Sequence, residues 1–117
     1  MKWNIDKSHP ICPQIFEQLC CFIANNKIHS KEKLFSVREL AVKLGVNPNT
    51  VMRSYEKLTN DGIIYNKRGI GYFISKDAKE IVLQTQRKEF LENELPVILR
   101  RMELLGINPE MLQISEK

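Results

Sequence analysis

The stretch SVRELAVKLGVNPNTVMRSYEKL, residues 36–58, decides the fold because it encodes two short helices and the turn between them. Ser36, with a glutamate three residues further on, is typical of a helix N-terminus closed by a capping box. Gly45 is a typical end for this helix, and Asn47 with Pro48 is a typical start for the next. Two helices joined by a short glycine-containing turn predict a helix-turn-helix.

Apolar residues at helical spacing predict the faces that these helices bury. Those residues are Val37, Leu40, Ala41 and Leu44 in the first helix and Val51, Tyr55 and Leu58 in the second. Upstream, the same spacing predicts a further helix over residues 13–26, which begins at Pro13 and ends at Asn25 and Asn26.

A β-hairpin is predicted directly after the helix-turn-helix, over residues 63–75. Apolar and aromatic residues with a preference for strands flank the turn NKRGIG, which is polar and contains two glycines. The order helix, helix-turn-helix, hairpin is that of a winged helix-turn-helix. We therefore expect a mainly α fold with a small β-hairpin: a winged helix-turn-helix DNA-binding domain over residues 1–76, followed by a short helical dimerisation tail over residues 77–117.

The tail carries an apolar seam with steps of four and three residues, as in two heptads of a coiled coil. Pro96 lies inside this pattern and should kink or break the helix. Such a seam predicts a homodimer, and the alternative is that the tail packs back onto its own chain. The predicted dimer-interface residues are Leu91, Leu95, Ile98, Met102 and Leu105.

Basic charge is concentrated in the first two-thirds of the chain. Residues 1–75 carry eleven Lys or Arg and six Asp or Glu, a net charge of +5. Residues 76–117 carry seven and eight, a net charge of −1. An anionic partner is therefore expected on the helix-turn-helix part.

Two nearly identical corners, LGVNP at residues 44–48 and LGINP at residues 105–109, differ in the residues on their C-terminal side. After the first come short polar and basic side chains, which suit phosphates and base edges at a helix N-terminus. After the second comes Glu110, which repels phosphate. The first corner is therefore predicted to contact double-stranded DNA and the second to be structural. The alternative for the first corner is a simple helix cap beside solvated side chains.

Basic groups also flank the first corner, at the start of the preceding helix and at the tip of the hairpin. A glycine at the hairpin tip lets the backbone approach a groove or a phosphate closely. The predicted DNA-binding residues are Ser36, Arg38, Asn47, Pro48, Asn49, Thr50, Arg53, Lys67, Arg68 and Gly69.

The remaining chemistry of the sequence excludes several classes. The three cysteines, Cys12, Cys20 and Cys21, form an odd set without a secretion signal, so no disulfide framework is expected. We expect small buried hydrophobes, with redox or metal sensing as the alternative. His9 and His29 show no zinc-ligand spacing, and no catalytic constellation or cofactor motif is present, so we expect no enzyme, metal or cofactor. Without a signal peptide or a bilayer-length apolar run, a cytoplasmic protein with no membrane partner is expected.

The stretch SVRELAVKLGVNPNTVMRSYEKLTNDGIIYNKRGIGYFIS resembles the DNA-binding domain of GntR-family bacterial transcriptional regulators. PICPQIFEQLCCFI resembles the first helix of that family, so the resemblance covers about residues 9–75. VNPNTVMRSYEKL and the short helical tail are most similar to the YtrA subfamily. Three departures are Phe35 where the family usually has Pro, Cys12 where an aromatic residue is common, and Pro96 within the tail helix.

The resemblance implies a homodimer held together by its tail helices, which binds a pseudo-palindromic operator and usually acts as a repressor. It implies DNA contacts by Arg38, by Asn47, Asn49 and Thr50, and by Gly69 near the minor groove. A small-molecule effector, of unknown identity, would have to use the dimer interface or the junction of wing and tail. The runner-up class is a winged-helix protein-interaction module without DNA binding.

Overall fold

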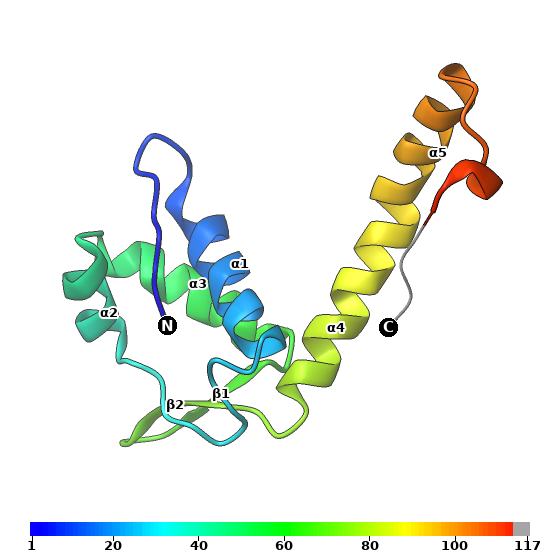
Figure 1. Ribbon diagram of the computed structural model, residues 1–117. Helices are drawn as coiled ribbons and strands as arrows, with labels where there is room; N and C mark the ends of the chain where they lie inside the picture. Colours follow the sequence, from blue (N-terminus) through cyan, green and yellow to red (C-terminus); the bar gives the residue numbers. More distant parts are fainter. Residues whose placement is uncertain (114–117) are drawn as a thin grey trace. The chain divides into compact units, whose positions relative to one another are not determined.

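The computed structural model of the 117-residue chain describes residues 1–113, and these fall into two compact units divided between Leu83 and Gln84. The first unit contains α1 (Ile11–Ala24), α2 (Val37–Leu44), α3 (Pro48–Asn60), β1 (Ile64–Lys67), β2 (Gly71–Ile74) and the beginning of α4 (Ala78–Glu89) (Figure 1). The second contains the rest of α4, a π-helical segment (Phe90–Glu94), α5 (Leu95–Leu104) and a 3₁₀ turn (Pro109–Met111).

The helix α2 begins and ends at the predicted residues, and α3 begins at the predicted one. The capping box of α2 is complete: the Oγ atom of Ser36 accepts the Glu39 N–H at 3.1 Å, and the Oε1 atom of Glu39 accepts the Ser36 N–H at 2.8 Å. The hydrogen bond from the Ser36 backbone lowers the pKa of Glu39 below its ordinary value. The local signals are therefore sufficient to fix this helix start.

The predicted start of α1 is wrong by two residues. The helix begins at Ile11, so Pro13 is its third residue. A proline fits there because the first N–H groups of a helix have no partner within it. The helix ends at Ala24, and Asn26 takes up the left-handed conformation with φ 59°, as expected of an asparagine stop.

The hairpin forms as predicted, with β1 and β2 antiparallel and Ile64 opposite Ile74. The connector before α2 adds to it: the Leu34 N–H donates to the Tyr72 carbonyl at 2.9 Å, and the Ile74 N–H donates to the Glu32 carbonyl at 2.9 Å. This connector, for which the sequence predicts no strand, therefore holds the hairpin on one side.

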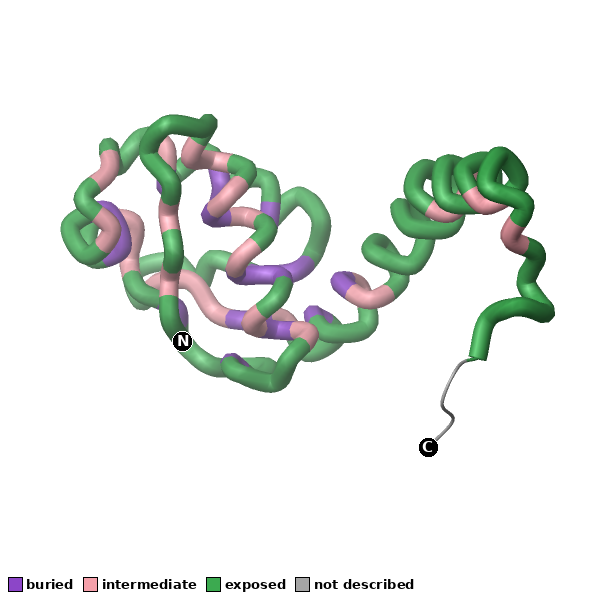
Figure 2. The backbone as a smooth tube through the Cα atoms, turned by 45° about the horizontal axis from the view of Figure 1, so that its top comes forward, coloured by how far each residue is buried: buried purple, intermediate pink, exposed green. Residues whose placement is uncertain are grey.

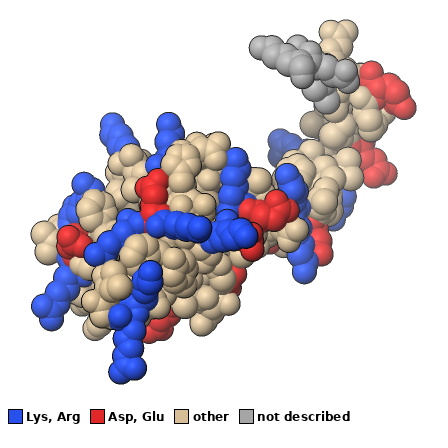
Figure 3. Space-filling view, turned by 90° about the horizontal axis from the view of Figure 1, so that it is seen from below, with Lys and Arg blue, Asp and Glu red and all other residues tan. Residues whose placement is uncertain are grey.

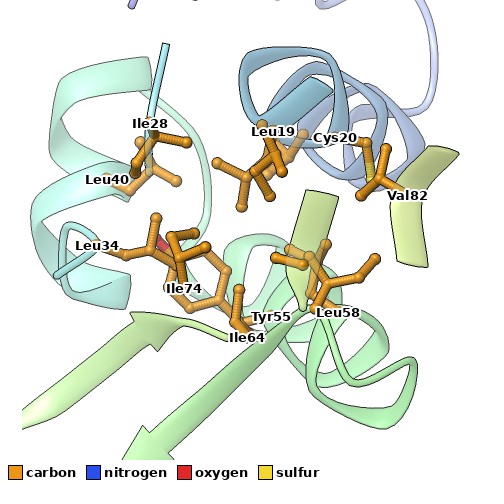
Figure 4. Packing of buried hydrophobic residues seen from close by; sticks show 14 of the residues in the cluster. Leu19, Cys20, Ile28, Leu34, Leu40, Tyr55, Leu58, Ile64, Ile74 and Val82 are labelled. Carbon is orange, nitrogen blue, oxygen red and sulfur yellow. The ribbon is translucent and has the colours of Figure 1, made fainter. Parts of the chain in front are cut away.

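One hydrophobic core joins all elements of the first unit (Figure 4). The predicted apolar faces point into it, although Val37, Leu44 and Phe22 are only partly buried. Figure 4 shows side chains of the three helices, the hairpin and the beginning of α4 gathered in one cluster, with Val82 of α4 beside Cys20 of α1. Core residues labelled there include Leu19, Cys20, Leu40, Tyr55, Leu58, Ile64, Ile74 and Val82.

The second unit has no comparable core among its described residues, and most of these residues are exposed (Figure 2). Its helix changes to π geometry over Phe90–Glu94, which ends two residues before Pro96. Proline lacks an N–H, and in a regular α-helix its ring would clash with the carbonyl four residues back. The interruption predicted at this proline therefore takes the form of a π segment. Within residues 1–113, no helix has both the length and the apolar character needed to cross a membrane.

Asn108 and Pro109, followed by the apolar residues Met111, Leu112 and Ile114, predict a short last helix after the second corner. The structure has only the 3₁₀ turn Pro109–Met111 there. Leu112 is already extended, with φ −82° and ψ 122°, and Ile114 lies outside the described residues. Met111 and Leu112 are exposed, so burial of apolar side chains does not stabilise a longer helix here.

Candidate nucleic-acid interface

The turn between α2 and α3 fixes the start of α3. Gly45 lies in the left-handed region with φ 67°, and the Val46 N–H donates to the Ala41 carbonyl at 3.0 Å, which closes α2. The Oδ1 atom of Asn47 then accepts the Asn49 N–H at 2.8 Å. The side-chain oxygen of Asn47 is therefore occupied by the cap, and its amide nitrogen is the group left for a ligand.

Four of the predicted DNA-binding residues lie in α3, and the first of them, Pro48, is exposed. Asn49 and Arg53 are exposed, whereas Thr50 is half-buried. The ammonium of Lys57, one turn after Arg53, lies over an aromatic ring of α1, with its Nζ 4.1 Å from the ring centroid of Phe16. The accessible polar surface of α3 is thus concentrated in its first two turns.

Tyr55 locks α3 to the neighbouring parts of the interface. Its buried hydroxyl donates to the Phe35 carbonyl at 2.7 Å. Its ring packs edge-on against the ring of Tyr72 in β2, with the two ring centroids 4.9 Å apart. Burial raises the pKa of the Tyr55 hydroxyl above its ordinary value, so the hydroxyl remains a donor. The segment before α2 and the hairpin are consequently positioned by one side chain of α3.

The predicted basic side chains are exposed and carry unneutralised charge. Over the described residues 1–113, the guanidinium groups of Arg38, Arg53 and Arg68 form no hydrogen bond or ion pair. The Nζ atom of Lys67 lies 5.6 Å from the ring centroid of Phe73, on the hairpin itself. Figure 3 shows basic side chains protruding around the outline of the first unit. Unpaired cations on an exposed surface favour a polyanionic partner.

The hairpin tip is open and needs its glycine. Gly69 has φ 78°, a conformation that other residues rarely adopt, and nothing lies within 4 Å of the position that a Cβ atom would take. Arg68 precedes it, and the exposed apolar side chain of Ile70 comes after it. Ile70 was not among the predicted site residues, although its place between two glycines is visible in the sequence.

A lysine that the sequence analysis did not select lies beside the helix-turn-helix turn. The Nζ atom of Lys7 is 2.9 Å from the position that a Cβ atom on Gly45 would occupy. The sequence held no direct signal for this approach, because it depends on how residues 1–10 run along α1.

The cysteines and the second corner have surroundings that differ from those of the basic side chains. Burial raises the pKa of the Cys20 thiol to about 12, so this side chain stays protonated and packs as a hydrophobe. The expectation of a buried side chain is wrong for Cys21, which is exposed, and Cys12 is only half-buried. Within residues 1–113, no three His, Cys, Asp or Glu side chains form a group suited to a metal ion. The carboxylate of Glu110 is exposed on its 3₁₀ turn in the second unit.

Comparison with known proteins gives one consistent result. The family model "Bacterial regulatory proteins, gntR family" matches residues 13–74. The HTH-type transcriptional repressor YtrA of Bacillus subtilis is 33% identical over 105 residues, which are 90% of this chain and 80% of that protein.

Solved structures agree with the sequence matches. A GntR family transcriptional regulator from Listeria monocytogenes is 38% identical with a TM-score of 0.75 and 91% of each chain covered. YtrA from Sulfolobus acidocaldarius, a GntR-family transcription factor, is 31% identical with a TM-score of 0.59, covering 77% of this chain and 95% of that one. These matches confirm the winged helix-turn-helix fold and the resemblance noted from the sequence. The chain belongs to the GntR family of bacterial transcriptional regulators.

Proposed function

We propose that this regulator binds a pseudo-palindromic operator as a homodimer and represses transcription. The observation that carries the proposal is the set of exposed basic groups without partners at three places of one fold: the start of α2, the start of α3 and the hairpin tip. A DNA duplex presents phosphates to all three at once when the second helix of such a motif enters the major groove.

Each group has a distinct role in this arrangement. Arg53 and Asn49, on the exposed side of α3, reach base edges or phosphates in the major groove. Arg38, the second residue of α2, contacts the phosphate backbone beside the groove. Because Tyr55 fixes the segment before α2 relative to α3, these contacts form without much further ordering.

The hairpin extends the contact beyond the major groove. Lys67 and Arg68 are placed to contact phosphates, and the open backbone at Gly69 can approach the minor groove closely. These residues add affinity and register more than direct base readout, because the minor groove distinguishes base pairs poorly.

Repression is the mode of action that the relatives favour. The similar protein YtrA of Bacillus subtilis is itself called a repressor. The first unit carries the proposed DNA-binding surface, and residues 1–113 form no third unit that could serve as a large effector domain. A protein of this kind, acting in the cytoplasm, represses most simply by occupying a promoter and excluding RNA polymerase.

The dimer would form through the tail. Leu91, Ile98 and Leu105 are 58%, 45% and 62% exposed, and Leu95 and Met102 are half-buried, although all five are apolar. A row of apolar side chains that are exposed or only half-buried favours an interface with a second copy of the chain. We expect Ile98→Asp to give a monomer in light scattering and Arg100→Ser to remain dimeric; a dimeric Ile98→Asp protein would argue against this interface.

The test of DNA recognition is fluorescence anisotropy with the DNA upstream of the protein's own gene and with a scrambled duplex of equal length. The expected result is tight binding to the first duplex alone, weakening with salt by about 0.9 in log–log slope for each phosphate contacted. A protein-interaction module would bind neither duplex, and equal binding to both would contradict a specific operator in this region.

A further inference from the structure

The N-terminal segment before α1 is fastened along that helix (Figure 1). The side-chain amide of Gln18 accepts the Asn4 N–H at 2.9 Å and donates back to the Asn4 carbonyl. The amide of Gln14 makes the same pair of bonds with the backbone of Asp6, both at 2.8 Å. The side chains of two glutamines four residues apart on one face of α1 thus bind the backbone N–H and carbonyl groups of Asn4 and Asp6. The backbone of a neighbouring β-strand would bind alternate residues in the same way.

Apolar contacts anchor the same segment, residues 1–10, which we call the N-terminal arm. The Trp3 ring meets Phe22 edge-on at a centroid distance of 5.0 Å, and Trp3 and Ile5 pack against the core. Aromatic pairs of this geometry stabilise a fold beyond the effect of the area they bury. The arm is therefore an ordered part of the first unit.

This anchoring places Lys7 at the helix-turn-helix turn. Its ammonium lies next to Gly45, at the C-terminus of α2, where the partial negative charge of the helix end attracts a cation. The nearest carboxylate in sequence, Asp6, is engaged by Ser8 and His9. Among the described residues no ion pair or hydrogen bond neutralises Lys7, so its donors remain available.

We propose that the N-terminal arm adds a phosphate contact to the DNA interface, made by the ammonium of Lys7 beside the turn that starts α3. The inference rests on the proposed function. The position is two residues from the Asn47 cap, at the end of α3 that would approach the DNA backbone. The family model begins at residue 13, so the arm lies outside the part of the chain that the family model matches.

The test is the salt dependence of operator affinity for Lys7→Ala, with Lys2→Ala as the matched control. Both substitutions remove one positive charge from the arm, but Lys2 lies at its far end, before the Trp3 anchor. We expect the log–log salt slope to shrink by about 0.9 for Lys7→Ala and to stay unchanged for Lys2→Ala. The loss should be equal on operator and scrambled duplexes, because a phosphate contact carries no base information.

An unchanged slope for Lys7→Ala, or an equal decrease for both variants, would overturn the inference. Wild-type protein that shows no salt-dependent operator binding would instead overturn the proposed function and this inference together. A purely structural Lys7, which only stabilises the end of α2, would lower the melting temperature without changing the slope.

A second variant tests whether the arm must be held in place. Gln14→Ala with Gln18→Ala keeps every charge but removes the six hydrogen bonds that these two side chains make to the backbone of the arm. We expect operator affinity to fall a few-fold, because the freed arm must be ordered on binding and loses conformational entropy. Unchanged affinity, with helix content confirmed by circular dichroism, would contradict a positioning role for these glutamines.

Discussion

The two corners LGVNP and LGINP are the same turn in different surroundings. Gly45 and Gly106 both have φ 67°. In each corner the N–H of the residue after the glycine donates to the carbonyl five residues back, at 3.0 Å in the first and 2.9 Å in the second. The two helices before them thus end in the same hydrogen-bonded motif.

The corners diverge after their proline. Behind the first, α3 continues over Pro48–Asn60, with Val51 and Leu58 completely buried. Behind the second, only the 3₁₀ turn Pro109–Met111 forms, and Leu112 is 48% exposed. The motif therefore sets the turn, and burial sets the length of the next helix. Only the first corner offers the positive end of a long helix to an anion.

The largest effect should come from the apolar residues behind each corner. Leu58→Ala leaves a cavity in the core and should lower the free energy of unfolding by about 2–5 kcal/mol. Leu112→Ala, at an exposed position, should change it by less than about 0.5 kcal/mol. Urea denaturation measures both, and equal losses would remove the distinction between the corners.

Substitution of the two glycines should give matched losses of stability. Ala at either position must adopt φ 67°, which costs about 1–2 kcal/mol. Gly45→Ala also displaces the flexible end of Lys7, whereas nothing lies within 4 Å at Gly106. Thermal unfolding should therefore show similar destabilisation, and anisotropy should show weaker DNA binding for Gly45→Ala alone. Weaker binding by Gly106→Ala would contradict this.

The cap of α2 should have a smaller effect on the same interface. Ser36→Ala removes the Oγ acceptor of the Glu39 N–H and should cost about 1 kcal/mol of stability. Ser36→Thr retains an acceptor at the cap and should recover most of the loss in a urea titration. Failure of Thr to recover it would indicate that the capping hydrogen bond is unimportant here.

The smallest effect should be the pH dependence due to Glu39. Its folded-state pKa is lowered, so its contribution to stability is present above the unfolded pKa of about 4.3 and is lost as pH falls through the folded pKa. Glu39→Gln should therefore show a flatter loss of stability than wild type as the pH falls below about 5. Parallel curves for the two proteins would contradict the role of the carboxylate in the cap.

Much of the winged helix-turn-helix was predictable because its signals are local. The cap at Ser36, the glycine at Gly45 and the Asn47–Pro48 start each act within a few residues, and together they set the bounds of α2 and the start of α3. The start of α1 was wrong because proline fits several positions of a first helical turn.

The features that were not predicted depend on contacts distant in sequence. The connector pairs with β2 through the carbonyl of Glu32 and the N–H of Leu34, although its polar sequence lacks a strand pattern. Lys7 reaches the turn only because Gln14 and Gln18 hold the arm on α1. The DNA-binding residues and the dimer seam that were selected from sequence stay predictions until they are measured.

The most direct test of the account compares operator affinity for Arg38→Ala, Arg53→Ala and Glu110→Ala by fluorescence anisotropy at one salt concentration. All three side chains are exposed, so circular dichroism should show folded proteins. We expect each arginine variant to bind about tenfold more weakly or worse, in line with about 1–3 kcal/mol for a good base contact or a charge-assisted phosphate contact. Glu110→Ala should bind as wild type. A large loss for Glu110→Ala with normal binding by both arginine variants would contradict the assignment of DNA recognition to the first corner.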